Sequence, residues 1–142
     1  MIHMHLKGIK HDPETGDYLY IGTSSNPRGH FLSRLDYTGN LKWGRVYNYS
    51  TSSYTDNNTF EYSPTYQTFY FTFTSGSKRL FKVNSLNGDI LNSFEIPEAY
   101  YSEKLSLSRD ELALYGSIQK SSNELVLFRF DTATSRINTK II

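Results

Sequence analysis

Cysteine is absent from this chain of 142 residues, which excludes disulfides and catalysis by a thiol. Apolar residues nowhere form the run of about 18–20 that a transmembrane helix requires, so we expect no membrane span. An excess of one charge is also lacking, since 15 basic residues nearly cancel 14 acidic ones and leave a net charge of +1. Without a basic stripe, the sequence gives no indication of nucleic acid as a partner.

The motifs of common catalytic and metal sites are missing as well. The sequence contains no Gly-x-Ser-x-Gly nucleophile elbow and no glycine-rich phosphate loop ahead of a helix. Three acidic residues lie close together at Asp12, Glu14 and Asp17, but their spacing is not that of an EF-hand. Pro13 and Gly16 instead mark an ordinary turn there. We therefore predict no catalytic residue, no cofactor and no metal site.

Aromatic residues, by contrast, are abundant. They make up 15% of the chain, with 12 tyrosines and 9 phenylalanines, and aromatic residues favour β-strands. The 37% of hydrophobic and 20% of charged residues are typical of a folded domain. No stretch shows the sustained periodicity of an amphipathic helix. The composition therefore predicts an all-β fold.

An internal repeat of 47–48 residues organises the chain. Asp36, Asn84 and Asp131 each end a strand-like run and open a short turn, and they lie 48 and 47 residues apart. Asp and Asn suit such turns because their side chains accept hydrogen bonds from backbone amides two residues on. Gly39 and Gly88 can supply the positive φ that these turns need, and Asn-Gly is a strong hairpin signal.

Each repeat contains four strand-like segments, which is the blade of a β-propeller. In successive repeats the segments lie near residues 5–9, 18–22, 32–36 and 41–43; 59–62, 69–73, 80–84 and 90–92; and 104–107, 112–116, 127–131 and 137–139. We predict one unit over residues 1–142, with blades at approximately 1–47, 48–96 and 97–142. The fold class is all-β and propeller-like, with three four-stranded antiparallel blades in an incomplete ring. A β-sandwich is the alternative, although it does not explain the period.

The first repeat resembles a known family. The segments 17–23, 31–36 and 39–43, the last ending in Trp43, are similar to the SBBP-type β-propeller repeat, with its "Gly-Asn-x-Tyr-x-x-Gly", "Lys-Leu-Asp" and "Gly-Asn-Leu-x-Trp". The resemblance covers residues 8–47. Later repeats depart from the pattern, since Phe94 stands near where the tryptophan would recur. The resemblance implies a propeller, often in secreted or surface proteins, without shared catalytic residues.

Three blades do not close a ring, because propellers typically close with four to eight. The two end faces would then remain open and apolar, and large apolar patches mark interfaces. The chain is therefore a piece of a longer propeller, half of a six-bladed ring of two copies, or the subunit of an open head-to-tail fibre. The sequence does not choose among these arrangements.

Tyrosines in the loops between the blades form a candidate ligand face. Tyr49, Tyr54, Tyr100 and Tyr101 lie near Asn and Ser residues. Tyr rings beside polar groups can bind a glycan or a peptide, but they can equally cover the core where strands begin.

Two glycosylation motifs occur in the first of these loops. Asn48 and Asn57 each begin an Asn-x-Ser/Thr sequon. They matter only in a secreted eukaryotic protein, and we expect an extracellular or cell-surface location from the resemblance.

The function that the sequence favours is that of a non-enzymatic structural or binding propeller segment that self-associates or belongs to a larger assembly. One alternative is a lectin-like propeller that binds carbohydrate or peptide. A second alternative is a fragment of a propeller enzyme whose catalytic residues lie in other blades.

The repeat makes two turn residues testable. Asp36→Ala and Gly88→Val should each lower the free energy of unfolding by about 1–3 kcal/mol, because both remove turn chemistry. Chemical unfolding of the two variants measures the effect. Wild-type stability in both would argue against the alignment of the repeats.

Overall fold

The computed structural model describes residues 4–25, 28–48, 60–75, 77–96, 101–121 and 123–142. Within these ranges the chain forms twelve β-strands: β1 (Met4–His11), β2 (Tyr18–Ser25), β3 (Arg28–Leu35), β4 (Leu41–Asn48), β5 (Phe60–Ser63), β6 (Thr68–Ser75), β7 (Ser77–Asn84), β8 (Ile90–Glu95), β9 (Tyr101–Leu107), β10 (Ala113–Ser121), β11 (Glu124–Asp131) and β12 (Arg136–Ile141).

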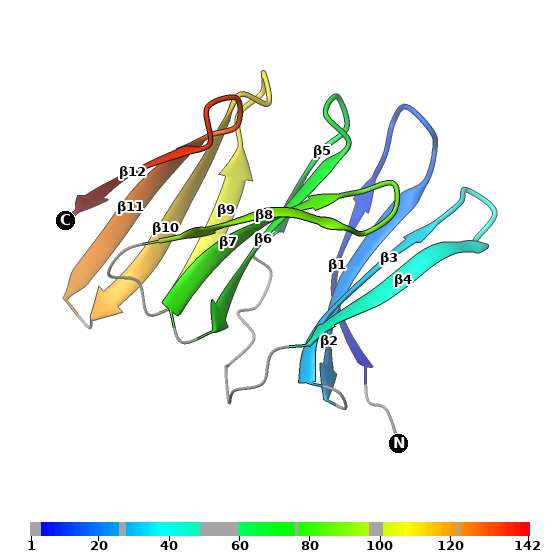
Figure 1. The fold of residues 1–142 in the computed structure, drawn as a ribbon, viewed down its shortest axis with the longest axis horizontal. Helices are drawn as coiled ribbons and strands as arrows, with labels where there is room; N and C mark the ends of the chain where they lie inside the picture. Colours follow the sequence, from blue (N-terminus) through cyan, green and yellow to red (C-terminus); the bar gives the residue numbers. More distant parts are fainter. Residues whose placement is uncertain (1–3, 26–27, 49–59, 76, 97–100, 122) are drawn as a thin grey trace.

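The strands form three separate four-stranded sheets, which we call sheets 1, 2 and 3. Sheet 1 contains β1–β4, sheet 2 contains β5–β8 and sheet 3 contains β9–β12, and consecutive strands pair antiparallel within each. Figure 1 shows the sheets side by side in the order of the chain, without closing into a ring. This confirms the predicted all-β fold of three four-stranded antiparallel blades.

The turns between the third and fourth strands use the same chemistry in every sheet. An oxygen of Asp36, Asn84 and Asp131 accepts a hydrogen bond from the backbone amide two residues on, at 2.9, 2.9 and 3.0 Å. Gly39 and Gly88 follow with φ of +91° and +80°. These turns fix where the fourth strand of each sheet begins, and so fix the register of the blade.

Sheets 1 and 2 pack face to face. We call the face of a sheet that points toward the next sheet along the chain its forward face, and the opposite face its rear face. Leu19 and Leu32 on the forward face of sheet 1 belong to one buried cluster with Phe69, Phe71 and Val83 of sheet 2. Phe71 stacks on Phe81 with ring centroids 5.3 Å apart. Aromatic packing thus forms most of this first contact.

Sheets 2 and 3 pack in the same way, using the other side of the strands in sheet 2. Tyr70 and Leu80 on its forward face belong to a second cluster with Leu114, Phe128 and Phe130 of sheet 3. Because side chains alternate between the faces of a strand, Tyr70 points forward while its neighbours Phe69 and Phe71 point back. Sheet 2 is therefore apolar on both faces and covered on both.

Trp43, on β4, joins sheet 1 to a turn of sheet 2. Its indole Nε1 donates a hydrogen bond to the backbone oxygen of Ser85, 3.0 Å away. A Cβ atom placed on Gly88 would lie only 2.8 Å from the Trp43 ring. Gly88 is thus required both for its positive φ and for the room it leaves to the neighbouring sheet.

Sheet-on-sheet packing is shared by propellers and β-sandwiches, but the repeated use of equivalent positions is what a propeller predicts. Each sheet is a meander of four consecutive strands, which is the connectivity of a blade.

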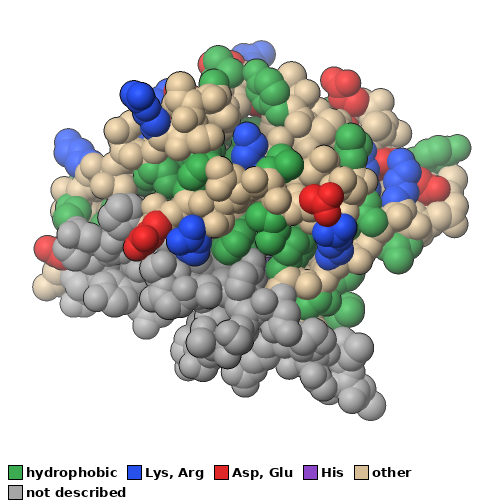
Figure 2. All heavy atoms as spheres, viewed as in Figure 1, with side chains coloured by type: hydrophobic (Ala, Val, Ile, Leu, Met, Phe, Trp, Pro, Cys, Tyr) green, Lys and Arg blue, Asp and Glu red, His purple; other side chains and the backbone are tan. Residues whose placement is uncertain are grey.

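On the face of the molecule drawn in Figure 2, acidic and basic side chains are interspersed and form no patch of one sign. No helix in the described part of the chain is long and apolar enough to cross a membrane.

Candidate functional site

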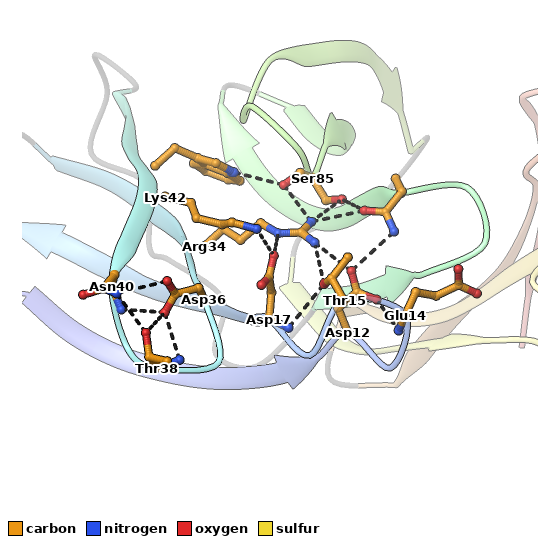
Figure 3. A network of polar contacts seen from close by, with 12 residues as sticks. Asp12, Glu14, Thr15, Asp17, Arg34, Asp36, Thr38, Asn40, Lys42 and Ser85 are labelled. Carbon is orange, nitrogen blue, oxygen red and sulfur yellow. Dashed lines mark hydrogen bonds and ion pairs between the residues drawn. The ribbon is translucent and has the colours of Figure 1, made fainter.

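A buried arginine lies at the turn end of the contact between sheets 1 and 2. Arg34, on β3, is only 1% exposed and extends from sheet 1 toward sheet 2 (Figure 3). Its Nε donates to Asp17 Oδ2 at 2.6 Å, and its Nη2 donates to Asp12 Oδ2 at 2.7 Å. Its Nη1 donates across the contact to Gln67 Oε1 at 3.1 Å and to the backbone oxygen of Ser85 at 3.2 Å. One side chain thus binds both sheets.

The two carboxylates that bind Arg34 have further donors. Asp17 Oδ2 accepts a hydrogen bond from Lys42 Nζ at 2.7 Å. Asp12 accepts hydrogen bonds from the Tyr62 hydroxyl at 2.9 Å and from the backbone amide of Glu14 at 3.0 Å. Two acidic side chains therefore face one arginine and one lysine, and the formal charges balance.

These hydrogen bonds control the ionisation of the acids. Burial would raise the pKa of Asp12, but donors including the Glu14 amide and the Tyr62 hydroxyl outweigh it and lower the pKa to about 2. Burial likewise opposes ionisation of Asp17, but hydrogen bonds from Lys42 and Arg34 lower its pKa. Both groups are therefore ionised at neutral pH, and Arg34 remains charged.

This network is suited to positioning the sheets rather than to catalysis. Each of the three guanidinium nitrogens of Arg34 already donates a hydrogen bond. The group is enclosed between two sheets, and a charged pair in that setting fixes how the sheets lie on each other. Among the described residues, no group of three or more His, Cys, Asp or Glu side chains is placed to hold a metal ion.

The end faces of the stack expose positions that are buried inside it. On the forward faces, the equivalent residues Leu32, Leu80 and Leu127 are 1%, 0% and 37% exposed. Leu127 is the exposed member because none of the three described sheets packs on the forward face of sheet 3. Leu19 and Tyr70 are equivalent positions of sheets 1 and 2, and each is 1% exposed. Their counterpart on sheet 3 is Tyr115, which is 48% exposed.

The rear faces show the same pattern at the opposite end. Tyr18, Phe69 and Leu114 are equivalent, and they are 38%, 0% and 0% exposed. Here the first sheet carries the exposed residue. Both open faces therefore present apolar side chains at positions that a neighbouring sheet covers elsewhere in the same chain.

The forward face of sheet 3 is also hollowed. A depression of about 320 Å³ is lined in part by Tyr115 and Leu127, together with Lys104, Ser106 and Ser117. Side chains of a neighbouring sheet fill the corresponding space at the two internal contacts, where aromatic rings of sheet 2 meet sheet 1. The end face thus has a shape that can receive further side chains.

The residues of the predicted turns are spread along one edge of all three sheets. Asp36, Asn84 and Asp131 hold their turns, and the pKa of Asp36 is lowered to about 2, chiefly by the Thr38 hydroxyl and then by the Asn40 amide. Gly39 has a positive φ in the same turn as Asp36, while Trp43 and Gly88 meet across the first contact.

The predicted ligand face lies largely outside the described residues. Tyr49, Tyr54, Tyr100 and the sequon residue Asn57 are not among them. Tyr101 begins β9 and Asn48 ends β4, but their side chains also lie outside the description. A tyrosine-based ligand face and glycosylation therefore remain predictions.

Sequence reasoning missed the Arg34 network. From the sequence, Asp12 and Asp17 are expected only to belong to an ordinary turn, because their spacing does not fit a calcium loop. The structure places both carboxylates against Arg34. A signal was present, because Arg34 interrupts an apolar strand between Leu32 and Leu35 on β3. A charged residue at a core position of a strand requires a buried partner.

Two comparisons of the sequence, with protein-family models and with curated proteins, give no match. The resemblance of residues 8–47 to SBBP-type repeats therefore stays a prediction.

Replacing Arg34 should destabilise the fold strongly. Arg34→Met leaves the carboxylates of Asp12 and Asp17 buried without their main partner, which should lower the free energy of unfolding by about 3–5 kcal/mol. Urea unfolding measures this loss. The matched control is Arg129→Met, because Arg129 is the counterpart of Arg34 on the open face and its nearly half-exposed side chain pairs with Asp131 only at 3.8 Å. That change should cost less than about 1 kcal/mol. Equal losses in the two variants would contradict a special role for Arg34.

The low pKa of Asp12 predicts acid sensitivity. Because the folded pKa of about 2 lies below the ordinary 3.8, ionised Asp12 stabilises the fold above about pH 4. This contribution is lost as the pH falls from about 4 toward 2. Asp12→Asn should be less stable than wild type at neutral pH, and its unfolding free energy should fall less between pH 5 and 2. Unfolding curves over this range test the sign, with Glu14→Gln in the same turn as control. An unchanged pH profile in Asp12→Asn would refute the assignment.

Proposed function

We propose that this chain is a non-enzymatic β-propeller segment whose two open end faces bind further blades, so that the isolated chain self-associates. The observation that supports it is the exposure of apolar side chains on the open forward face of sheet 3 and on the open rear face of sheet 1. Leu127 and Tyr18 are exposed only at the ends, while their counterparts inside the chain are at most 1% exposed. The same positions are thus buried where another sheet packs on that face and exposed where none of the described sheets does.

Burial of these faces would be favourable because it removes apolar side chains from water, as the contacts between the sheets do inside the chain. Apolar surface contributes roughly 25 cal/mol per Å² when removed from water, and exposed apolar patches of this kind mark protein interfaces. The internal contacts pair a forward face with a rear face at both junctions. We therefore infer that copies associate forward face to rear face.

Such a contact is heterologous, since it uses two different surfaces. It produces a ring when the rotation between copies closes and a fibre when it does not. Two copies of three blades fit the six blades of a closed propeller. A structural role follows from either outcome, because the binding surfaces are the bodies of the sheets and not a pocket with reactive groups.

Light scattering together with negative-stain microscopy tests the proposal. The wild-type chain of 16.4 kDa should have a mass of at least twice that value. Leu127→Glu should reduce it to the monomer, because the added charge lies on the open forward face. Leu86→Glu is the control, since Leu86 is 58% exposed in the turn before β8 and away from either end face. A compact wild-type monomer would refute the proposal.

A mixing experiment tests the pairing of unlike faces. Tyr18→Glu blocks the rear face and Leu127→Glu blocks the forward face, so each variant alone should be monomeric. Mixed in equal amounts, the two variants keep one intact forward-to-rear contact and should form a dimer of defined mass. A dimer of Tyr18→Glu alone would instead mean that like faces pair.

A further inference from the structure

The contact between sheets 2 and 3 contains a partly open cavity. It has a volume of about 310 Å³ and is lined by side chains of both sheets, among them Thr68, Tyr70 and Lys82 of sheet 2 and Leu112 and Thr132 beside sheet 3. Pockets for small molecules start at roughly 300 Å³. Because the cavity lies inside one chain, what it binds is independent of how copies of the chain associate.

The internal repeat identifies this cavity as the counterpart of the Arg34 network. Lys82 occupies on β7 the position that Arg34 occupies on β3. The partners of the arginine are also replaced at the second contact. Thr68 stands in the place of Asp17, and Tyr66 in the place of Thr15. Leu112 stands in the place of Gln67, Thr132 in that of Ser85, and Leu91 in that of Lys42. All five line the cavity.

The substitution that matters most is the loss of the carboxylates. At the first contact Arg34 is neutralised by Asp12 and Asp17. At the second contact their places are taken by Ser63 and Thr68, neither of which carries charge. The cation of the repeat is thus retained as Lys82, and the space that its acidic partner would fill is left as a cavity.

Two hydrogen-bond donors in the cavity are without partners. Within the described part of the chain, Lys82 makes no hydrogen bond or ion pair, and the Tyr70 hydroxyl makes no hydrogen bond. Tyr70 is 1% exposed as a residue, and it lines the cavity. Burial, and then the charge of Glu111, raise the pKa of Tyr70 to about 12, so the hydroxyl stays protonated and can donate.

The remaining walls restrict the kind of ligand. Leu91, Leu112 and Ala133 are apolar. The hydroxyls of Thr68 and Thr132 already donate to backbone oxygens, at 2.9 and 3.0 Å. One cation and one neutral donor match a single negative charge.

We propose that this cavity binds a small organic monocarboxylate with an apolar body. The carboxylate accepts hydrogen bonds from Lys82 and Tyr70 and takes the place that Asp17 has at the first contact. The apolar body lies against Leu91 and Leu112. Charge-assisted hydrogen bonds from the Lys82 ammonium and a hydrogen bond from the Tyr70 hydroxyl give the site its preference for an anion over a neutral molecule of the same shape.

Equilibrium dialysis with labelled benzoate, and in parallel with neutral benzamide, tests the proposal. Benzoate should bind with one site per chain, and benzamide at least tenfold more weakly. Equal affinity for the two would overturn the proposal, and so would the absence of saturable binding of both benzoate and cyclohexanecarboxylate.

Variants locate the site. Lys82→Met should weaken benzoate binding at least tenfold and Tyr70→Phe severalfold, whereas Lys140→Met, at an exposed lysine on β12, should leave it unchanged. Unchanged affinity in Lys82→Met would place any binding elsewhere and overturn the assignment. Circular dichroism of each variant verifies that the fold is kept.

A second pair of variants tests the same idea without relying on loss of the lysine. Thr68→Asp restores the carboxylate that the first contact has, and it should occupy Lys82 from within the chain. Benzoate binding should then fall at least tenfold, while the neutral, similarly shaped Thr68→Asn should reduce it far less. Equal effects of the two substitutions would contradict the proposal.

Discussion

The packing of one sheet upon the next is the interaction on which everything else in this chain depends. Side chains alternate between the two faces of every strand, and in this sequence both sets are apolar over the middle of the sheets. Phe69 and Tyr70 are neighbours on β6, yet each is at most 1% exposed because each faces a different sheet. A single four-stranded sheet of this kind cannot cover its own faces. Stability therefore belongs to the stack, and the first and last sheets are each covered on only one side.

Arg34 adds specificity to that packing. Apolar surfaces tolerate sliding, whereas the arginine has acceptors at fixed places on both sheets, including Asp17 on its own side and Ser85 across the contact. A buried ion pair contributes little net stability compared with apolar packing, but it penalises every arrangement that leaves a charge unpaired. The second contact lacks such a pair. The two junctions of one chain thus combine the same sheet geometry with different chemistry, and this contrast is what makes the cavity at the second junction recognisable.

Much of the architecture could be read from the sequence, because turn residues and strand composition repeat. Asp36, Asn84 and Asp131 mark equivalent turns, whose spacing yields the three units, and the strand-like segments around them yield four strands in each unit. The Arg34 network could not be found in this way. Its members come from a turn, a strand and the following blade, and proximity across 51 residues between Arg34 and Ser85 is set by tertiary packing. The cavity is still less accessible to sequence reasoning, since it results from groups that are missing at equivalent positions.

The meeting of Trp43 with the turn at Gly88 gives the stack a direction. The indole belongs to the sheet behind and the glycine to the sheet ahead, so the two sides of the junction are chemically different. A series of blades joined in this way has two distinguishable termini, comparable to the two ends of a polar filament. The terminus with the open forward face would present Tyr115 and Leu127 of sheet 3, and the terminus with the open rear face would present Tyr18 of sheet 1. Each terminus would then have its own rate of addition, and a molecule that capped one would leave the other free to grow.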